Sequence, residues 1–179
     1  MPSIDEERQL AAVETLAAGF VTEQQGLDIA ARHPMVTGSI ARWIRETALA
    51  GDLRRAQRLA NAAAALRAPG LGAVLQELLD ADIPDLNNED FVDILGDIGA
   101  ADSVACILRV VERSLDRDAP AYWLTQKAIS SLTDIGTEKA LDHVRGMTEP
   151  MWPNVVRWHA AYALDIDEEL GFDEDTMIG

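Results

Sequence analysis

The sequence is poor in cysteine, in aromatic residues and in long apolar segments. Its one cysteine, Cys106, excludes an internal disulfide and lies in the apolar run Val104–Val111, where we expect a buried, inert thiol. Aromatic residues make up only 5% of the chain, so small and aliphatic residues supply most of the 48% that is hydrophobic. No segment approaches the roughly 18–20 apolar residues that a membrane-spanning helix requires. These shortages favour closely packed helices and exclude a disulfide scaffold or a membrane span.

Basic residues are scarce as well. The net charge is −16, and no Lys or Arg occurs between Ala68 and Leu108 or between Asp165 and Asp175. This disfavours nucleic acid and anionic membranes as partners, because both require Lys and Arg to neutralise phosphates. An acidic surface can attract a basic protein partner, although it can equally be a merely solvated surface. Acidic residues stand where a signal peptide would be basic, so we expect a cytoplasmic location.

Helix signals recur along the chain, and the alternating pattern of strands is missing. N-cap signals stand at Ser3, Thr22 and Asp52, and helix-stopping glycines at Gly19 and Gly51. Pro34 is expected to end a second helix, with the third beginning at about Ser39. Pro120 suits the first turn of a later helix, and Pro153 the beginning of the last long one. The sequence therefore predicts an all-α fold.

A repeated segment indicates how the helices are organised. Leu95-Gly96-Asp97-Ile98-Gly99 is matched 37 residues later by Leu132-Thr133-Asp134-Ile135-Gly136. A third, partial copy over Val156–Leu164 places its Leu164 another 32 residues on. A period of this size is typical of stacked helical pairs, each too small to bury its own apolar face.

This alternation of a helix, a glycine-containing turn and a second helix resembles the HEAT repeat, particularly the short HEAT-like form associated with phycobilisome lyases. The residues that carry the likeness are Leu95, Gly96, Ile98, Gly99, Ala105 and Leu108, then Leu132, Ile135, Gly136, Ala140 and Leu141, and finally Val156, Arg157, Ala160, Ala161, Ala163 and Leu164. The resemblance implies a short right-handed α-solenoid of antiparallel helix pairs, with about eight to ten helices. Such motifs report packing, so they say little about function.

We expect one solenoid domain over residues 1–179. Its parts would be degenerate helical pairs over 1–79, HEAT-like repeats over 88–170 and an acidic, mobile tail over 171–179. The segment Asp80–Asn88 contains Pro84 and two asparagines and is predicted to be an irregular linker.

Charged and aromatic residues suggest where a partner would bind. Tyr122, Trp123, Trp152, Trp158 and Tyr162 lie in or near consecutive helices of the repeat half. Tyr122 and Trp123 fall outside the apolar stripe of their helix, so we expect at least one of them to be exposed. The aromatic residues either pack between repeats or anchor a partner. The predicted partner-binding set is Tyr122, Trp123, Trp152, Trp158, Asp93, Asp97 and Asp134.

A group of arginines contrasts with this acidic half. It consists of Arg42, Arg45, Arg54, Arg55, Arg58 and Arg67. We expect these residues to pair with the acidic half, either within the molecule or in a homodimer.

No catalytic residue, metal or cofactor is expected. The three histidines have no metal-ligand spacing, and no Ser/His/Asp set can be assembled. Asp165, Asp167 and Glu169 alternate as in a calcium loop, but Leu170 and Thr176 stand where that loop needs glycine and a bidentate acid.

The sequence thus favours a non-enzymatic module that binds a basic protein, such as a bacterial immunity-type inhibitor or an adaptor. The alternative is a HEAT-like enzyme or enzyme subunit that resembles DNA alkylpurine glycosylases or bilin lyases. A self-associating scaffold is a third possibility.

Overall fold

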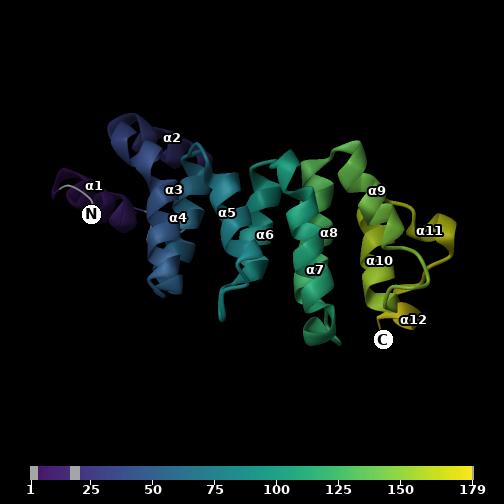
Figure 1. Cartoon of the computed structure of the whole chain (residues 1–179). Coiled ribbons are helices and arrows are strands. Elements are labelled where there is room, and N and C mark those ends of the chain that lie inside the picture. The colour runs from purple at the N-terminus through teal and green to yellow at the C-terminus, as the bar shows by residue number, and fades with distance from the viewer. Residues whose placement is uncertain (1–3, 17–20, 179) are drawn as a thin grey trace. The chain divides into compact units, whose positions relative to one another are not determined.

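The computed structural model describes residues 4–16 and 21–178, and over these residues the chain is helical without any strand (Figure 1). Ten helices of nine or more residues and two single-turn α-helices occur in this part of the chain, together with one 3₁₀ turn. The all-α prediction is therefore confirmed. The caps predicted at Ser3 and Gly19 lie outside the described residues.

The chain divides into two compact units, Met1–Asn87 and Asn88–Gly179. The boundary falls within the segment Asp80–Asn88 that was predicted to be a linker. The first unit contains α1 (Ile4–Leu16), α2 (Glu23–Arg32), α3 (Pro34–Leu49), α4 (Leu53–Ala65) and α5 (Leu71–Asp80). The second contains α6 (Asn88–Asp97), η1 (Ala101–Ser103), α7 (Val104–Asp118), α8 (Trp123–Ile135), α9 (Glu138–Gly146), α10 (Asn154–Ala163), α11 (Asp167–Leu170) and α12 (Glu174–Met177).

In the first unit, helices two places apart in the sequence lie in contact. α3 contacts both α1 and α5, and α4 contacts α2, while α3 and α4 form the most extensive pair. Fully buried aliphatic side chains fill the space between them: Ile40 and Ile44 from α3, Leu59 from α4, and Leu75 and Leu78 from α5. Each helix buries one stripe against its neighbours, as amphipathic helices do.

The prediction for the second and third helices was partly wrong. α2 ends at Arg32, but α3 begins at Pro34 and not near Ser39. A proline has no backbone N–H to donate and its φ angle already suits a helix, so the first helical position tolerates it. Pro34 therefore starts the third helix directly after a one-residue break at His33.

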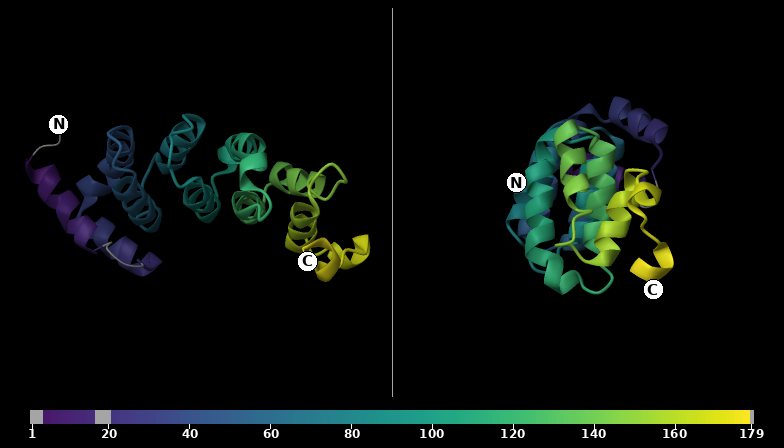
Figure 2. Two further views of the ribbon diagram at one scale, coloured as in Figure 1. Left: turned by 90° about the horizontal axis from the view of Figure 1, so that it is seen from below. Right: turned by 90° about the vertical axis from the view of Figure 1, so that its right-hand side faces the viewer.

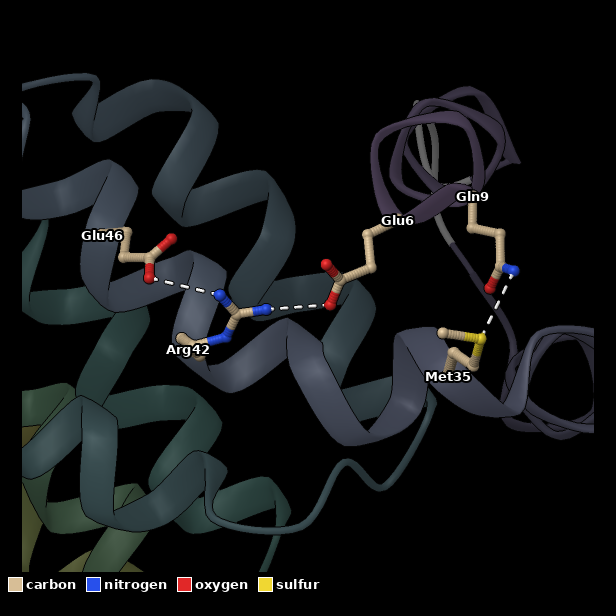
Figure 3. A network of polar contacts seen from close by, with 5 residues as sticks. All are labelled: Glu6, Gln9, Met35, Arg42 and Glu46. Atoms are coloured by element: carbon tan, nitrogen blue, oxygen red, sulfur yellow. Dashed lines mark hydrogen bonds and ion pairs between the residues drawn. The ribbon is translucent and has the colours of Figure 1, made fainter. Parts of the chain in front are cut away.

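Polar contacts and a small apolar stripe hold α1 on α3 (Figure 3). Arg42 of α3 donates to Glu6 of α1 at 3.0 Å, and Gln9 reaches the sulfur of Met35 at 3.9 Å. Further along α1, Leu10 and Val13 are buried. The side of α1 that faces α3 thus combines an apolar stripe with a charged edge.

In the second unit, the three copies of the repeated segment fall on α6, α8 and α10, and these helices are neighbours. α6 contacts α8 and α8 contacts α10, whereas α7 and α9 each lie against α8 (Figures 1 and 2). Contact between successive copies is what a stack of repeats requires, because each copy covers the apolar face of the next. Phe91, Leu95, Ile107 and Leu132 are fully buried between them.

The ends of several helices lie where the sequence placed them. Thr22 and Gln25 form a capping box at α2, and Gly136 ends α8 with φ of 64°. The C-terminal residues include a further helical turn. After Gly171, where a mobile tail was expected, Asp173 caps the single turn α12, and α12 contacts α10.

Candidate functional site

Most of the predicted partner-binding residues lie on α6 and α8. Asp93 and Asp97 are on α6, and Asp134 is near the end of α8. Trp123 is the first residue of α8 and Tyr122 is its N-cap. The two helices form the most extensive helix pair of this unit. The fold therefore brings together residues that are up to 41 positions apart in the sequence.

Asp118, at the end of α7, fixes the beginning of α8. Its carboxylate accepts hydrogen bonds from the backbone N–H groups of Leu124 and Thr125, at 3.2 and 3.0 Å, and from the Thr125 hydroxyl at 3.1 Å. Tyr122 adopts a left-handed backbone conformation with φ of 55°, and its N–H donates to the carbonyl of Asp118 at 2.7 Å. A carboxylate from the preceding helix thus caps the first turn, in the role usually taken by the N-cap side chain.

This cap leaves the side chain of Trp123 largely in solvent. Trp123 is 61% exposed, whereas Leu124 and Thr125, which follow it, are buried. The prediction that Tyr122 or Trp123 would be exposed is confirmed for Trp123, and Tyr122 is half-buried. The exposed stripe of α8 continues with Lys127, one turn further on, then Ser130 and Asp134.

Lys127 joins α8 to α6. Its Nζ donates to Oδ1 of Asp93 at 3.0 Å. This hydrogen bond is the main reason that the pKa of Lys127 is raised, and the charges of Asp93, Asp90 and Asp97 act in the same direction. A single ammonium group therefore lies among several carboxylates.

Two carboxyl groups near Lys127, those of Asp97 and Glu89, are held in unfavourable electrostatic surroundings. Burial raises the pKa of Asp97, and the charges of Asp93 and Asp134 raise it further. Burial likewise raises the pKa of Glu89, followed by the charges of Asp118 and Asp90. Lys127 lowers both values but does not cancel the effect. We call this region the α6–α8 acidic face; its residues are Glu89, Asp90, Asp93, Asp97, Asp118, Trp123, Lys127 and Asp134.

Two of the predicted aromatic anchors do not belong to this face. Trp158 is only 9% exposed, and its ring lies 5.0 Å from the rings of both Tyr162 and His159. The prediction of Trp158 as an anchor needs correction, because its indole packs within the last part of the chain. Trp152 precedes α10 and is half-buried. The sequence pattern did not distinguish these two residues from Trp123, because the helices packed around each tryptophan decide whether it is buried.

Four arginines of the first unit have carboxylate partners within the same unit. Arg55 forms a two-pronged ion pair with Glu14, at 2.5 and 2.9 Å, and this contact raises its pKa. The other pairs are Arg42 with Glu6 and Glu46, Arg45 with Glu77, and Arg67 with Glu23. The expectation that these arginines pair with the acidic half is corrected, because carboxylates of α1, α2, α3 and α5 already neutralise four of them within the first unit.

The described residues include no group of three or more His, Cys, Asp or Glu that could hold a metal ion. In the same part of the chain, none of the helices has the length and apolarity to cross a membrane. The carboxylates of the α6–α8 acidic face can attract positive charge, and the exposed indole of Trp123 at the start of α8 offers apolar contact.

The fold places this chain in the class of all-helical proteins in which successive helices contact in a repeat-like order. Comparison with protein-family models, with curated proteins and with solved structures finds no match. The resemblance to HEAT repeats therefore rests on the residues that carry it.

Proposed function

We propose that this protein is a non-enzymatic binding module that recognises a basic protein through the α6–α8 acidic face. Its role would be that of an immunity-type inhibitor, which covers a cationic site on its partner, or of an adaptor. The observation that carries the proposal is the group of carboxylates around Lys127 on α6 and α8, a helix pair that also presents the exposed Trp123.

Trp123 supplies the apolar part of the contact. Tryptophan is enriched among the residues that dominate binding energy in interfaces, where it is buried on association. An indole that is 61% exposed has surface available for such burial. Because Asp118 fixes the backbone at this point, the indole starts from a defined position, which reduces the entropy lost on binding.

The carboxylates supply charge complementarity. After burial, the charges of Asp93 and Asp134 are the next causes of the raised pKa of Asp97, so these carboxylates repel that of Asp97. A partner's Lys or Arg placed among them would relieve this repulsion. Complementary charge accelerates association and selects the partner, and its effect weakens as salt rises.

The distribution of charge agrees with this assignment. The second unit has 19 acidic and 7 basic residues, a net charge of −12, whereas the first has 12 acidic and 8 basic residues, a net charge of −4. A basic protein would therefore be drawn mainly toward the unit that contains Trp123.

Co-purification from the native cell at low salt, with three forms of the protein, tests the proposal. The site variant carries Asp93→Asn, Asp97→Asn and Asp134→Asn. The matched control carries Asp102→Asn, Asp116→Asn and Glu149→Gln, which remove the same charge from exposed positions of the same unit. We expect the wild type and the control to retain the same basic protein, and the site variant and Trp123→Ser to lose it.

Rising salt should release this partner, because screening weakens the attraction between exposed charges. A partner that stays bound at high salt would contradict recognition by this face. The same holds if the site variant and the control variant lose the partner to the same extent.

The enzymatic alternative makes different predictions. A DNA-glycosylase-like protein should be retained on heparin at moderate salt, and a bilin-lyase subunit should change the visible spectrum of added bilin. Either result would count against a purely binding role. The mass in solution over a range of concentrations tests the self-associating scaffold.

A further inference from the structure

Tyr162, near the C-terminal end of α10, has one covered and one open ring face. Its ring stacks on Trp158, with centroids 5.0 Å apart and planes 12° from parallel. Tyr162 is nevertheless 63% exposed, while Trp158 is buried and meets His159 edge-on. Because the indole supports one side of the phenol ring, the opposite side faces solvent in a fixed orientation.

The segment that follows α10 brings negative charge to the helix that carries this ring. Asp165–Asp175 contains seven carboxylates and no base, and both α11 and α12 contact α10. The backbone N–H of Asp165 donates to the carbonyl of Tyr162 at 3.0 Å. Glu174 of α12 lies near His159, where its charge opposes the lowering of the histidine pKa by burial. The acidic segment therefore packs against the helix that carries Tyr162.

Arg157 shows which kind of group an aromatic ring of this region accepts. Its guanidinium lies 4.9 Å from the centroid of the Phe172 ring. Its Nε and Nη1 also donate to the Thr148 carbonyl and to Oδ1 of Asn154, at 3.0 and 3.1 Å. All of these partners are uncharged, and they hold the Arg157 guanidinium over Phe172.

We propose that the open face of Tyr162 binds an arginine side chain of a protein partner. The planar guanidinium would stack on the phenol ring, and the carboxylates of Asp165 and Glu174 would supply the counter-charge. A compact ammonium group cannot stack in this way, so arginine is favoured over lysine. This contact lies on a different helix from Trp123, and it holds whether or not the α6–α8 acidic face binds anything.

The chain has only two tyrosines, Tyr122 and Tyr162, which makes a direct test possible. Protein labelled with 3-fluorotyrosine gives two ¹⁹F resonances, and the Tyr162→Leu variant assigns them. The probe is the peptide acetyl-Gly-Arg-Gly-amide, and its neutral control contains citrulline in place of arginine. We expect the arginine peptide to shift the Tyr162 resonance in a saturable way and to leave the Tyr122 resonance nearly unchanged.

Removing the counter-charge provides a second test. In the Asp165→Asn/Glu174→Gln variant, the affinity for the arginine peptide should fall by roughly two- to fivefold, the range expected for weak contacts between exposed groups. The Asp102→Asn/Asp116→Asn variant, which loses the same charge elsewhere in the unit, should bind as the wild type does.

The contribution of the Tyr162 ring can be measured separately from that of the charges. The reporter is the shift of the Trp158 indole N–H resonance when the arginine peptide is added. The Tyr162→Phe variant keeps an aromatic face and should retain the shift, whereas Tyr162→Leu should lose it. An unchanged Tyr162 resonance, equal shifts with citrulline or with acetyl-Gly-Lys-Gly-amide, or lost binding in Tyr162→Phe would each overturn the proposal.

Discussion

Ser131 of α8 lies so close to Gly96 of α6 that no side chain fits between them. A Cβ atom added at position 96 would stand 2.7 Å from Cα of Ser131 and 2.8 Å from its Cβ. The two residues are next to Leu95 and Leu132, the buried leucines that mark the first two copies of the repeated segment. Gly96 therefore sets the distance at which the first two copies pack.

Gly96→Ala should destabilise the second unit. The new methyl group meets backbone atoms, which cannot rotate away, so α6 and α8 must separate. Overpacking of this kind costs about 1–3 kcal/mol. The matched control is Gly38→Ala, at an exposed helical position where nothing lies within 4 Å of the added Cβ. It should stabilise by about 0.5–1 kcal/mol, because alanine restricts the unfolded chain. Urea unfolding, monitored by circular dichroism, gives the free energy of unfolding of both variants. If Gly96→Ala left this free energy unchanged, the close packing would be contradicted.

Asp118→Ala should weaken the beginning of α8. The substitution removes the acceptor for two backbone N–H groups of the first turn, and losing a cap of this kind costs about 1 kcal/mol. Asp118→Asn keeps an oxygen acceptor and should lose less. Asp116→Ala, two residues earlier on α7, is the control and should leave the thermal midpoint nearly unchanged. If Asp118→Ala and Asp116→Ala lowered the thermal midpoint equally, the result would argue against the cap.

Glu14→Gln should loosen α1 from α4. Glu14 is partly buried and accepts two hydrogen bonds from Arg55, so we expect its charge to contribute about 1 kcal/mol. Glu77→Gln breaks the exposed pair with Arg45 and should cost almost nothing. A double-mutant cycle with Arg55→Gln isolates the pair, and a coupling energy near zero would show that this ion pair does not help to hold α1 on α4.

Asp97→Asn should change how stability depends on pH. The pKa of Asp97 in the folded protein is raised above its ordinary value of 3.8, so the folded state binds this proton more tightly than the unfolded state. Tighter binding of this proton stabilises the folded state. That stabilisation is complete below the ordinary value and is lost as the pH rises through the folded pKa. At pH 7 the asparagine variant should therefore be the more stable, by about 0.5 kcal/mol or less, and the difference should vanish near pH 3.

The control for this prediction is Asp116→Asn, whose effect should not follow the same pH profile. If Asp97→Asn were less stable than the wild type at pH 7, the carboxylate would be making a favourable contact, and repulsion would not dominate at this face.

The helical class and many helix ends could be predicted because they depend on local chemistry. Thr22 and Gln25 satisfy each other's backbone groups within one turn, and Gly136 adopts a φ angle that other residues disfavour, so both signals act without the rest of the fold. Pro34 was ambiguous for the same local reason. A proline is compatible both with the end of one helix and with the beginning of the next.

What determined the candidate site was contact between helices distant in the sequence. Trp123 and Trp158 are both helical tryptophans, yet one is exposed and the other buried, because burial depends on which helix lies alongside. Asp93, Asp97 and Asp134 could be named from the repeat. Only the packing of α6 on α8 places Lys127 against Asp93 and adds the charges of Asp93 and Asp134 to burial in raising the pKa of Asp97. The sequence by itself determined the helices and their repeat, since these follow from neighbours along the chain. The tertiary structure alone decided exposure and electrostatic coupling, since both depend on distances through space.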